Sequence, residues 1–394
     1  MSFSTFSSGE VHMKKFHVLT TALAAAVFLA GCGGNEAGNQ KPRVAFTSMV
    51  SFGDSLSDVG SYAVGAVAAQ GGGHYSINGI GATGLLWTNW TEFLSATLDL
   101  AAPCAAETGL NTIQAVVGAP PVPATFHDAS TGGTCTNYAQ GGARVTNPVG
   151  PGNALLFNAS VPSTYSNAIG QLTVPVQTQI ANYLAHNGGK FTNDQLVSVF
   201  AGGNDIFINV ATFQATVGAG GDPTAAATAA VTAMAHAGAE EAGYINAMIL
   251  ANGATHVVVI NLPDVSLTPF AIASGPSGQA LVKNMTQAFN STLQGSLTAS
   301  ANLVFVDAFA ASEDQATNMA QYGLDNVTTP ACTSSSSLVC TKNTLIGAVA
   351  PAASGAAATA ANTYEYADSV HPTPYGYRLL AELVSEQLAI KGWL

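Results

Sequence analysis

The chain has 394 residues, 48% of them apolar, which is enough for one large α/β domain with inserted loops. Charged residues make up only 8% of the chain, and the formal net charge is −12. An acidic chain repels the phosphate backbone, so the composition argues against nucleic acid as a partner and suits a secreted protein better.

The N-terminal segment resembles an export signal. Lys14 and Lys15 precede a mostly apolar run over residues 18–30, which has the length of a signal-peptide core and is short for a membrane span. The run ends in the sequence LAGC, which resembles the bacterial lipobox, where the cysteine is lipidated and becomes the first mature residue. We therefore predict a lipoprotein signal peptide over residues 1–32, with lipidation at Cys32. The alternative is a secretory signal that happens to contain a cysteine.

The residues after the lipobox indicate where in the cell the protein is sent. Residues 33–43 are polar and contain several glycines, which predicts a flexible tether. Gly33, in place of an aspartate, resembles the pattern of lipoproteins sent to the outer membrane. We expect the protein to be exported and held at the bacterial outer membrane or cell surface by this lipid anchor. Met1 and Met13 both stay open as the start of translation.

Residues 44–394 are expected to form a single domain in which buried strands alternate with helices. Continuous apolar runs predict strands covered on both faces, as in a parallel sheet, over residues 45–52, 196–201, 256–261 and 303–306, with a further short strand near 136–139. Helical periodicity predicts helices over residues 87–98, 174–185, 225–252, 278–297 and 374–390. This alternation is typical of a three-layer α/β domain. Three stretches lack this alternation of strands and helices. They are expected to be loops or insertions, over residues 101–133, 148–168 and 312–363.

Four cysteines remain besides Cys32, and an even number in an exported chain predicts two disulfides. They are Cys104, Cys135, Cys332 and Cys340. Proximity favours the pairs Cys104–Cys135 and Cys332–Cys340, although four cysteines allow three connectivities. No C-x-x-C pair or histidine cluster accompanies them, so we expect no metal site.

The first expected strand leads directly into the sequence FGDSLSD, in which Ser55 follows Gly53 and Asp54. A serine at a turn between strand and helix exposes its Oγ at the top of the sheet, and its own N–H can point at a developing oxyanion. The alternative is an ordinary helix cap made by aspartate and serine. The chain lacks the G-x-S-x-G elbow of other esterases at this serine.

Near the C-terminus, the sequence DSVHP places Asp368 three residues before His371, at the start of the last expected helix. On such a turn the carboxylate can hold the Nδ1–H of the imidazole while Nε2 faces Ser55. The alternative is a polar entry to the helix.

Two glycine-containing motifs follow expected strands, NYAQGGAR at residues 137–144 and GGND at residues 202–205. The backbone of Gly142, or of Gly141 beside it, can approach a substrate closely because glycine has no side chain. The side-chain amide of Asn204 is a hydrogen-bond donor. The alternatives are a Gly-Gly turn and an Asx turn that end the two strands.

The four motifs follow one another along the chain at residues 52–58, 137–144, 202–205 and 368–372, and in that order they resemble the motif blocks of the GDSL (SGNH) hydrolases. The resemblance implies a flavodoxin-like three-layer α/β/α sandwich with a five-stranded parallel sheet. It also implies that Ser55 is a nucleophile with Asp368 and His371 as its partners. The oxyanion hole would consist of the N–H groups of Ser55 and Gly142 and the side chain of Asn204.

The function that follows from the resemblance is hydrolysis of carboxylic (acyl) esters through an acyl-enzyme, without metal or organic cofactor. We expect lipid-like or short to medium acyl esters as substrates. A phospholipase, an acyltransferase and a polysaccharide O-deacetylase using the same site stay open, and a cell-surface scaffold lipoprotein is the non-enzymatic alternative. The sequence gives no indication of the oligomeric state.

Overall fold

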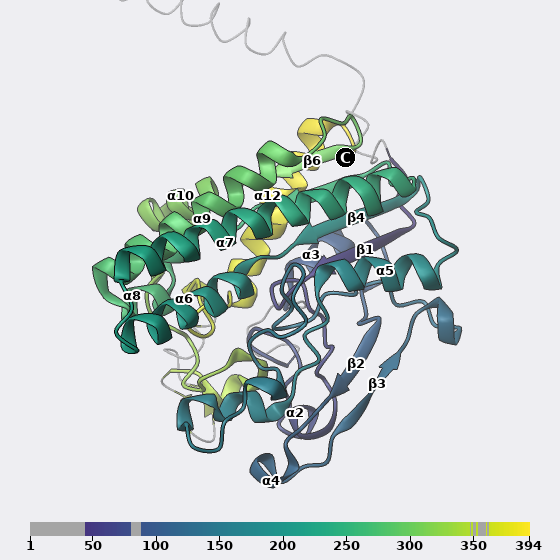
Figure 1. Ribbon diagram of the computed structural model, residues 1–394. Coiled ribbons are helices and arrows are strands. Elements are labelled where there is room, and N and C mark those ends of the chain that lie inside the picture. Colours follow the sequence, from purple (N-terminus) through teal and green to yellow (C-terminus); the bar gives the residue numbers. More distant parts are fainter. Residues whose placement is uncertain (1–43, 80–87, 347, 350–351, 354–359, 361) are drawn as a thin grey trace, which may run out of the picture. The chain divides into compact units, whose positions relative to one another are not determined.

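The computed structural model describes residues 44–79, 88–346, 348–349, 352–353, 360 and 362–394 (Figure 1). The predicted signal peptide, the tether and Cys32 lie outside these residues. Val44–Trp393 form one unit by their mutual contacts. None of the described helices is both long enough and apolar enough to cross a membrane.

A parallel sheet of four strands, in the order β1-β4-β5-β6, runs through the described domain (Figure 1). The strands are β1 (Ser48–Gly53), β4 (Gln195–Phe200), β5 (Val257–Ile260) and β6 (Leu303–Val306). Val197 pairs with Val50 on one side and with Val257 on the other, and all three are fully buried. Apolar side chains on both faces are what a sheet covered by helices requires, which confirms the parallel α/β sheet expected from the sequence.

The sheet has four strands rather than the five that the resemblance implies. The segment near 136–139 does lie beside β1, since the N–H of Ser51 donates to Thr136 O at 3.1 Å and Tyr138 N donates to Ser51 O at 2.8 Å. Its pairing with β1 is an isolated parallel bridge between Ser51 and Asn137, and Asn137 makes another such bridge with Ala105. The side chain of Asn137 bonds to Ser57 O and to the N–H of Ala139, and such local side-chain bonds compete with a regular ladder.

Helices cover both faces of the sheet. One core cluster joins alternate residues of the strands, such as Phe52 and Val199, to side chains of α5 (Val176–His186), α7 (Pro223–Tyr244) and α9 (Gly275–Ser296). The opposite face is covered by α3 (Trp90–Thr97) and α12 (Pro374–Lys391), as Figure 1 shows. The result is the three-layer arrangement that the sequence predicts.

The expected helices are present, with the one over 225–252 continuing past α7 as a π-helical turn η4 (Ile245–Ile249) and a 3-10 turn η5 (Leu250–Asn252). Two helices were not expected: α6 (Gly203–Gly218) follows β4, and α10 (Ala308–Thr317) follows β6. The remaining short helices are α2 (Gly65–Ala69), α4 (Gln114–Val117), α8 (Pro269–Ala273), η1 (Ala129–Thr131), η2 (Ala154–Leu156), η3 (Pro162–Ile169), η6 (Val265–Leu267), η7 (Met319–Tyr322), η8 (Ser337–Val339) and η9 (Lys342–Thr344).

The three stretches expected as insertions contain short elements of their own. An antiparallel pair, β2 (Glu107–Leu110) and β3 (Val122–Phe126), lies in the first, and a second pair, β7 (Ala348–Val349) and β8 (Ala352–Ala353), lies in the third. Disulfides join Cys104 to Cys135 and Cys332 to Cys340, which confirms the pairing by proximity. The first insertion is thus closed by a disulfide, and the third contains a short disulfide-closed loop.

Candidate active site

Ser55 lies in the turn after β1, at the carboxyl end of the strand. Gly53 is required there because a Cβ atom at this position would lie 2.3 Å from Phe200 O of the neighbouring strand. The side chain of Gln179 holds the same residue from α5, accepting from Gly53 N and donating to Gly53 O, both at 2.8 Å. Parallel sheets place their sites at these strand ends, so the turn carries Ser55 to the expected edge.

Ser55, His371 and Asp368 form a continuous hydrogen-bonded chain. The Oγ of Ser55 lies 2.8 Å from Nε2 of His371, and Nδ1 of His371 lies 2.8 Å from Oδ2 of Asp368. The side chain of Asp368 is buried, and that of His371 is 13% exposed. The fold therefore brings together residues that are 316 positions apart, in the geometry that the motifs predict.

The carboxylate of Asp368 is held in its ionised form. Burial alone would raise its pKa, but the charge of His371 and the hydrogen bonds from His371 and Ser337 outweigh this and hold the pKa well below its usual range. The backbone N–H of Ser337 donates to Oδ2 at 2.6 Å, and those of Val370 and His371 donate to Oδ1 at 2.9 Å. An ionised carboxylate at this place fixes the proton of the imidazole on Nδ1.

The ring of Tyr75 packs against the imidazole ring of His371 in a tilted arrangement. The ring centroids of Tyr75 and His371 are 4.7 Å apart. The hydroxyl of Tyr377 donates to Tyr75 O at 3.2 Å, which ties α12 to this contact. The orientation of His371 is thus fixed by packing as well as by Asp368.

Asn204 lies in the first turn of α6 and lines the same cavity as Ser55 and His371. Its Nδ2 donates to Ala143 O at 2.8 Å, which leaves the second N–H of the amide for a ligand. Asp205 next to it accepts from Arg144 Nε at 2.8 Å and from Val145 N at 3.0 Å. Asp205 therefore anchors the 137–144 motif to α6 and has a structural role.

The structure distinguishes the two candidate glycines of the 137–144 motif. The N–H of Gly141 donates to Asp58 Oδ2 at 2.9 Å, whereas the N–H of Gly142 bonds to none of the described residues. Gly142 has a φ of +76°, and a Cβ there would lie 2.1 Å from Pro151 O. Only glycine fits this position, although Gly142 is not among the residues that line the cavity.

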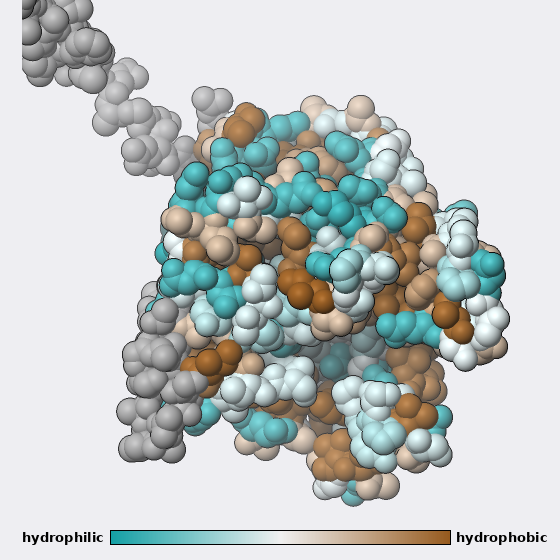
Figure 2. All heavy atoms as spheres, turned by 90° about the vertical axis from the view of Figure 1, so that its left-hand side faces the viewer, coloured by the Kyte–Doolittle hydropathy of each residue, from teal (hydrophilic) through white to brown (hydrophobic). Residues whose placement is uncertain are grey.

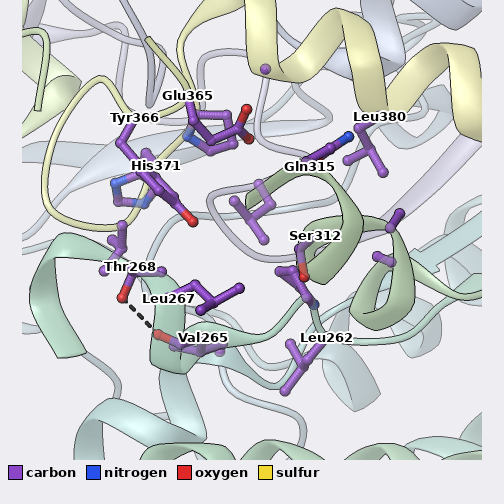
Figure 3. A pocket seen from close by; sticks show the side chains of 18 of the residues that line it. Leu262, Val265, Leu267, Thr268, Ser312, Gln315, Glu365, Tyr366, His371 and Leu380 are labelled. Carbon is purple, nitrogen blue, oxygen red and sulfur yellow. Dashed lines mark hydrogen bonds between the residues drawn. The ribbon is translucent and has the colours of Figure 1, made fainter. Parts of the chain in front are cut away.

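The cavity next to Ser55 has a volume of about 110 Å³ and mostly apolar walls. Figure 3 shows Leu262, Val265 and Leu267, from the segment after β5, facing Leu380 of α12. Polar side chains are interspersed: Thr268, Ser312, Gln315, Glu365 and Tyr366. The site can hold a small, largely apolar group next to the serine.

Sequence reasoning missed three contributors to the site: Gln179, Ser337 and Glu365. Ser337 contributes only a backbone N–H, and Gln179 acts through the backbone of Gly53, so neither carries a motif. Glu365 precedes the DSVHP motif by three residues, and nothing in its sequence context marks it as a cavity residue. Asp54, which belongs to a recognised motif, has its pKa raised to about 7 by burial.

Among the residues that the structure describes, no group of three or more His, Cys, Asp or Glu side chains could hold a metal ion. The face that carries α8 is a mosaic of hydrophilic and hydrophobic residues (Figure 2). This mixed surface agrees with the low fraction of charged residues in the chain.

The α/β fold and the Ser–His–Asp chain of hydrogen bonds at the edge of the sheet define the class of the serine hydrolases. A family model described as GDSL-like Lipase/Acylhydrolase matches residues 49–384. The chain therefore belongs to this family, whose members are ester-hydrolysing enzymes. No curated protein matches the chain.

Proposed function

We propose that the protein hydrolyses carboxylic esters in two steps, with Ser55 as the nucleophile. The single observation that carries the proposal is the 2.8 Å contact between Ser55 Oγ and His371 Nε2, two residues that line the cavity. His371 accepts the proton of Ser55 as Oγ attacks the ester carbonyl, and it then donates this proton to the leaving alcohol. Water repeats the sequence on the acyl-enzyme, releasing the acid and restoring Ser55.

Three donors stabilise the oxyanion in this proposal. They are the N–H groups of Ser55 and Gly142 and the side-chain amide of Asn204. Neither of the two N–H groups bonds to a described residue, which supports their availability to a substrate. Donors of this kind contribute about 3–4 kcal/mol each in other hydrolases because they are already oriented when charge develops.

The substrates we propose are lipid-like or short to medium acyl esters. The leucine side chains of the cavity support an acyl chain, and its volume of about 110 Å³ supports a short one or part of a longer one.

A direct test is covalent labelling with an alkyl fluorophosphonate, which phosphonylates an activated serine with loss of fluoride. We expect one label per chain, located on the peptide that contains Ser55, and no label on a Ser55→Ala variant. Labelling of another serine, or none on a folded protein, would contradict the assignment of Ser55.

We further propose that the protein is exported and held at the outer membrane or cell surface by a lipid on Cys32. The LAGC sequence supports this, and two disulfides are typical of proteins outside the reducing cytosol. Mass analysis of the mature N-terminus tests it. A lipidated Cys32 as first residue is expected, and an unmodified Cys32 inside a longer chain would refute the anchor.

A further inference from the structure

We propose that the cavity beside Ser55 contains a subsite for a hydroxyl group at Glu365, in a wall that also includes Tyr366 and Gln315, and that the enzyme prefers esters of hydroxylated acids. The inference rests on the proposed ester hydrolysis and specifies its substrate class. Its basis is that Glu365, which lines the mostly apolar cavity, has a buried carboxyl oxygen without a hydrogen-bond partner among the described residues.

Glu365 is the central member of the subsite. Its Oε2 is buried and has no hydrogen-bond partner among the described residues. Figure 3 shows its side chain among those that surround the cavity, on the side of Leu380 and Gln315. A buried polar group without a partner costs free energy, so a ligand that supplies a partner gains correspondingly.

Tyr366 and Gln315 also lack hydrogen-bond partners in the described part of the chain, but unlike Glu365 Oε2 their polar atoms are not buried. Neither side chain makes a hydrogen bond with the residues that the structure describes, although both line the cavity. The other two polar residues of this wall differ: Thr268 Oγ1 donates to Val265 O at 2.7 Å (Figure 3), and Ser312 Oγ donates to Phe309 O at 2.8 Å. Glu365 Oε2 is therefore the buried atom of this wall to which a ligand can supply a missing hydrogen bond.

The chemistry favours a neutral hydroxyl as the partner. Burial raises the pKa of Glu365 to about 7, so near neutral pH much of this carboxyl is uncharged and can both donate and accept a hydrogen bond. Tyrosine and glutamine side chains also donate and accept. A hydroxyl group can hydrogen-bond with each of these side chains, whereas an ammonium group would need a fully ionised carboxylate.

The acyl part of the ester is the part that we place in this subsite. In the proposed mechanism the acyl group stays on Ser55 while the alcohol leaves and water enters. A cavity walled by Leu262, Leu267 and Leu380 suits the group that stays.

The test compares ethyl hexanoate with ethyl esters of hexanoic acid that carry one hydroxyl on carbon 3, 4, 5 or 6. Release of ethanol by the full-length protein gives kcat/KM for each ester. We expect at least one hydroxylated ester to exceed ethyl hexanoate by about tenfold or more, the size of one good hydrogen bond. Glu365→Leu should remove this preference, and Glu365→Gln should keep part of it.

Thr268→Val is the matched control, because it removes a hydroxyl of the cavity that the protein already satisfies. Its ratio between hydroxylated and plain esters should equal that of the wild type. Equal kcat/KM for all five esters would refute the subsite while leaving ester hydrolysis intact, and so would a preference that persists in Glu365→Leu. A higher kcat/KM for ethyl 6-aminohexanoate than for every hydroxylated ester would also refute it. If the folded wild type hydrolysed none of the esters, the proposed function itself would fail.

Discussion

Asp54 and Asp368 are both buried carboxyl groups next to reacting residues, yet their environments shift their pKa values in opposite directions. Asp368 is paired with His371 and accepts three backbone N–H bonds, and its pKa lies below the usual range. Asp54 has only the N–H of Leu56 at 3.0 Å, and burial raises its pKa to about 7. The ionised Asp368 can therefore orient His371, while Asp54 is largely neutral below neutral pH.

The raised pKa of Asp54 predicts a specific pH dependence of stability. Its pKa in the unfolded chain is close to 3.8, so the folded state binds the proton more tightly. The stabilisation from this protonation is fully present below about pH 4 and is lost as the pH rises through 7. Asp54→Asn cannot ionise, so between pH 5 and pH 8 we expect the variant to gain on the order of 2–3 kcal/mol relative to wild type. Urea unfolding at both pH values measures this, and a pH-independent difference would contradict it.

Asn204 offers a test of the oxyanion hole. Removing one such donor lowers kcat by about 10²–10³-fold in other hydrolases, and we expect the same of Asn204→Ala, with KM little changed. The control is Asn209→Ala on the same helix, whose Nδ2 donates to Asp205 O and which does not line the cavity. Similar kcat losses in both variants would show that α6 is merely perturbed and would contradict a role for Asn204.

At the scale of elements, the buried strands could be predicted from the sequence because an apolar run such as VVVI in β5 has few alternatives to a covered sheet. Helices α6 and α10 could not be predicted from the sequence. The N-cap of α6 is Gly202 without a side-chain bond, and its sequence mixes Asn, Thr and β-branched residues that weaken helical propensity. In α10 only Ala308 is buried, so no apolar period marks it.

The disulfide-closed segment Cys332–Cys340 supports the site from an insertion. Ser337 within it donates its N–H to Asp368, and Asn78 Nδ2 donates to Ser337 O at 3.0 Å. The cysteines can be recognised in the sequence, but this contact cannot, because a backbone N–H donor does not depend on the type of residue.

Opening this disulfide is expected to affect catalysis. In a Cys332→Ser/Cys340→Ser variant, the segment should be more mobile, which should weaken the hydrogen bond from Ser337 N–H to Asp368. We expect kcat to fall by about tenfold, with KM nearly constant. A Cys104→Ser/Cys135→Ser variant is the matched control, since both variants should lose about 2–4 kcal/mol of stability but only the first should lose kcat. Steady-state kinetics well below both unfolding transitions distinguishes them. Equal effects on kcat would contradict the positioning role of the segment.

At the scale of the whole molecule, the site depends on long-range contacts that only the fold provides. The motifs predicted which residues meet, because the carboxyl ends of parallel strands gather at one edge of the sheet. The cavity could not be predicted in the same way, since its walls come from the segment after β5, from α10 and from α12. Glu365 and its neighbours become recognisable as a group only when these segments are packed together.

The central claim is that Ser55 is the nucleophile of an ester hydrolase, and one measurement tests it most directly. It is the hydrolysis of p-nitrophenyl acyl esters of increasing chain length by wild type, Ser55→Ala and Ser57→Ala. Ser57 lies in the same turn, but its Oγ accepts from Trp90 Nε1 at 3.2 Å. We predict that Ser55→Ala lowers kcat by at least about 10⁴-fold, while Ser57→Ala stays within about tenfold of wild type. A folded Ser55→Ala protein with activity close to that of wild type would contradict the account.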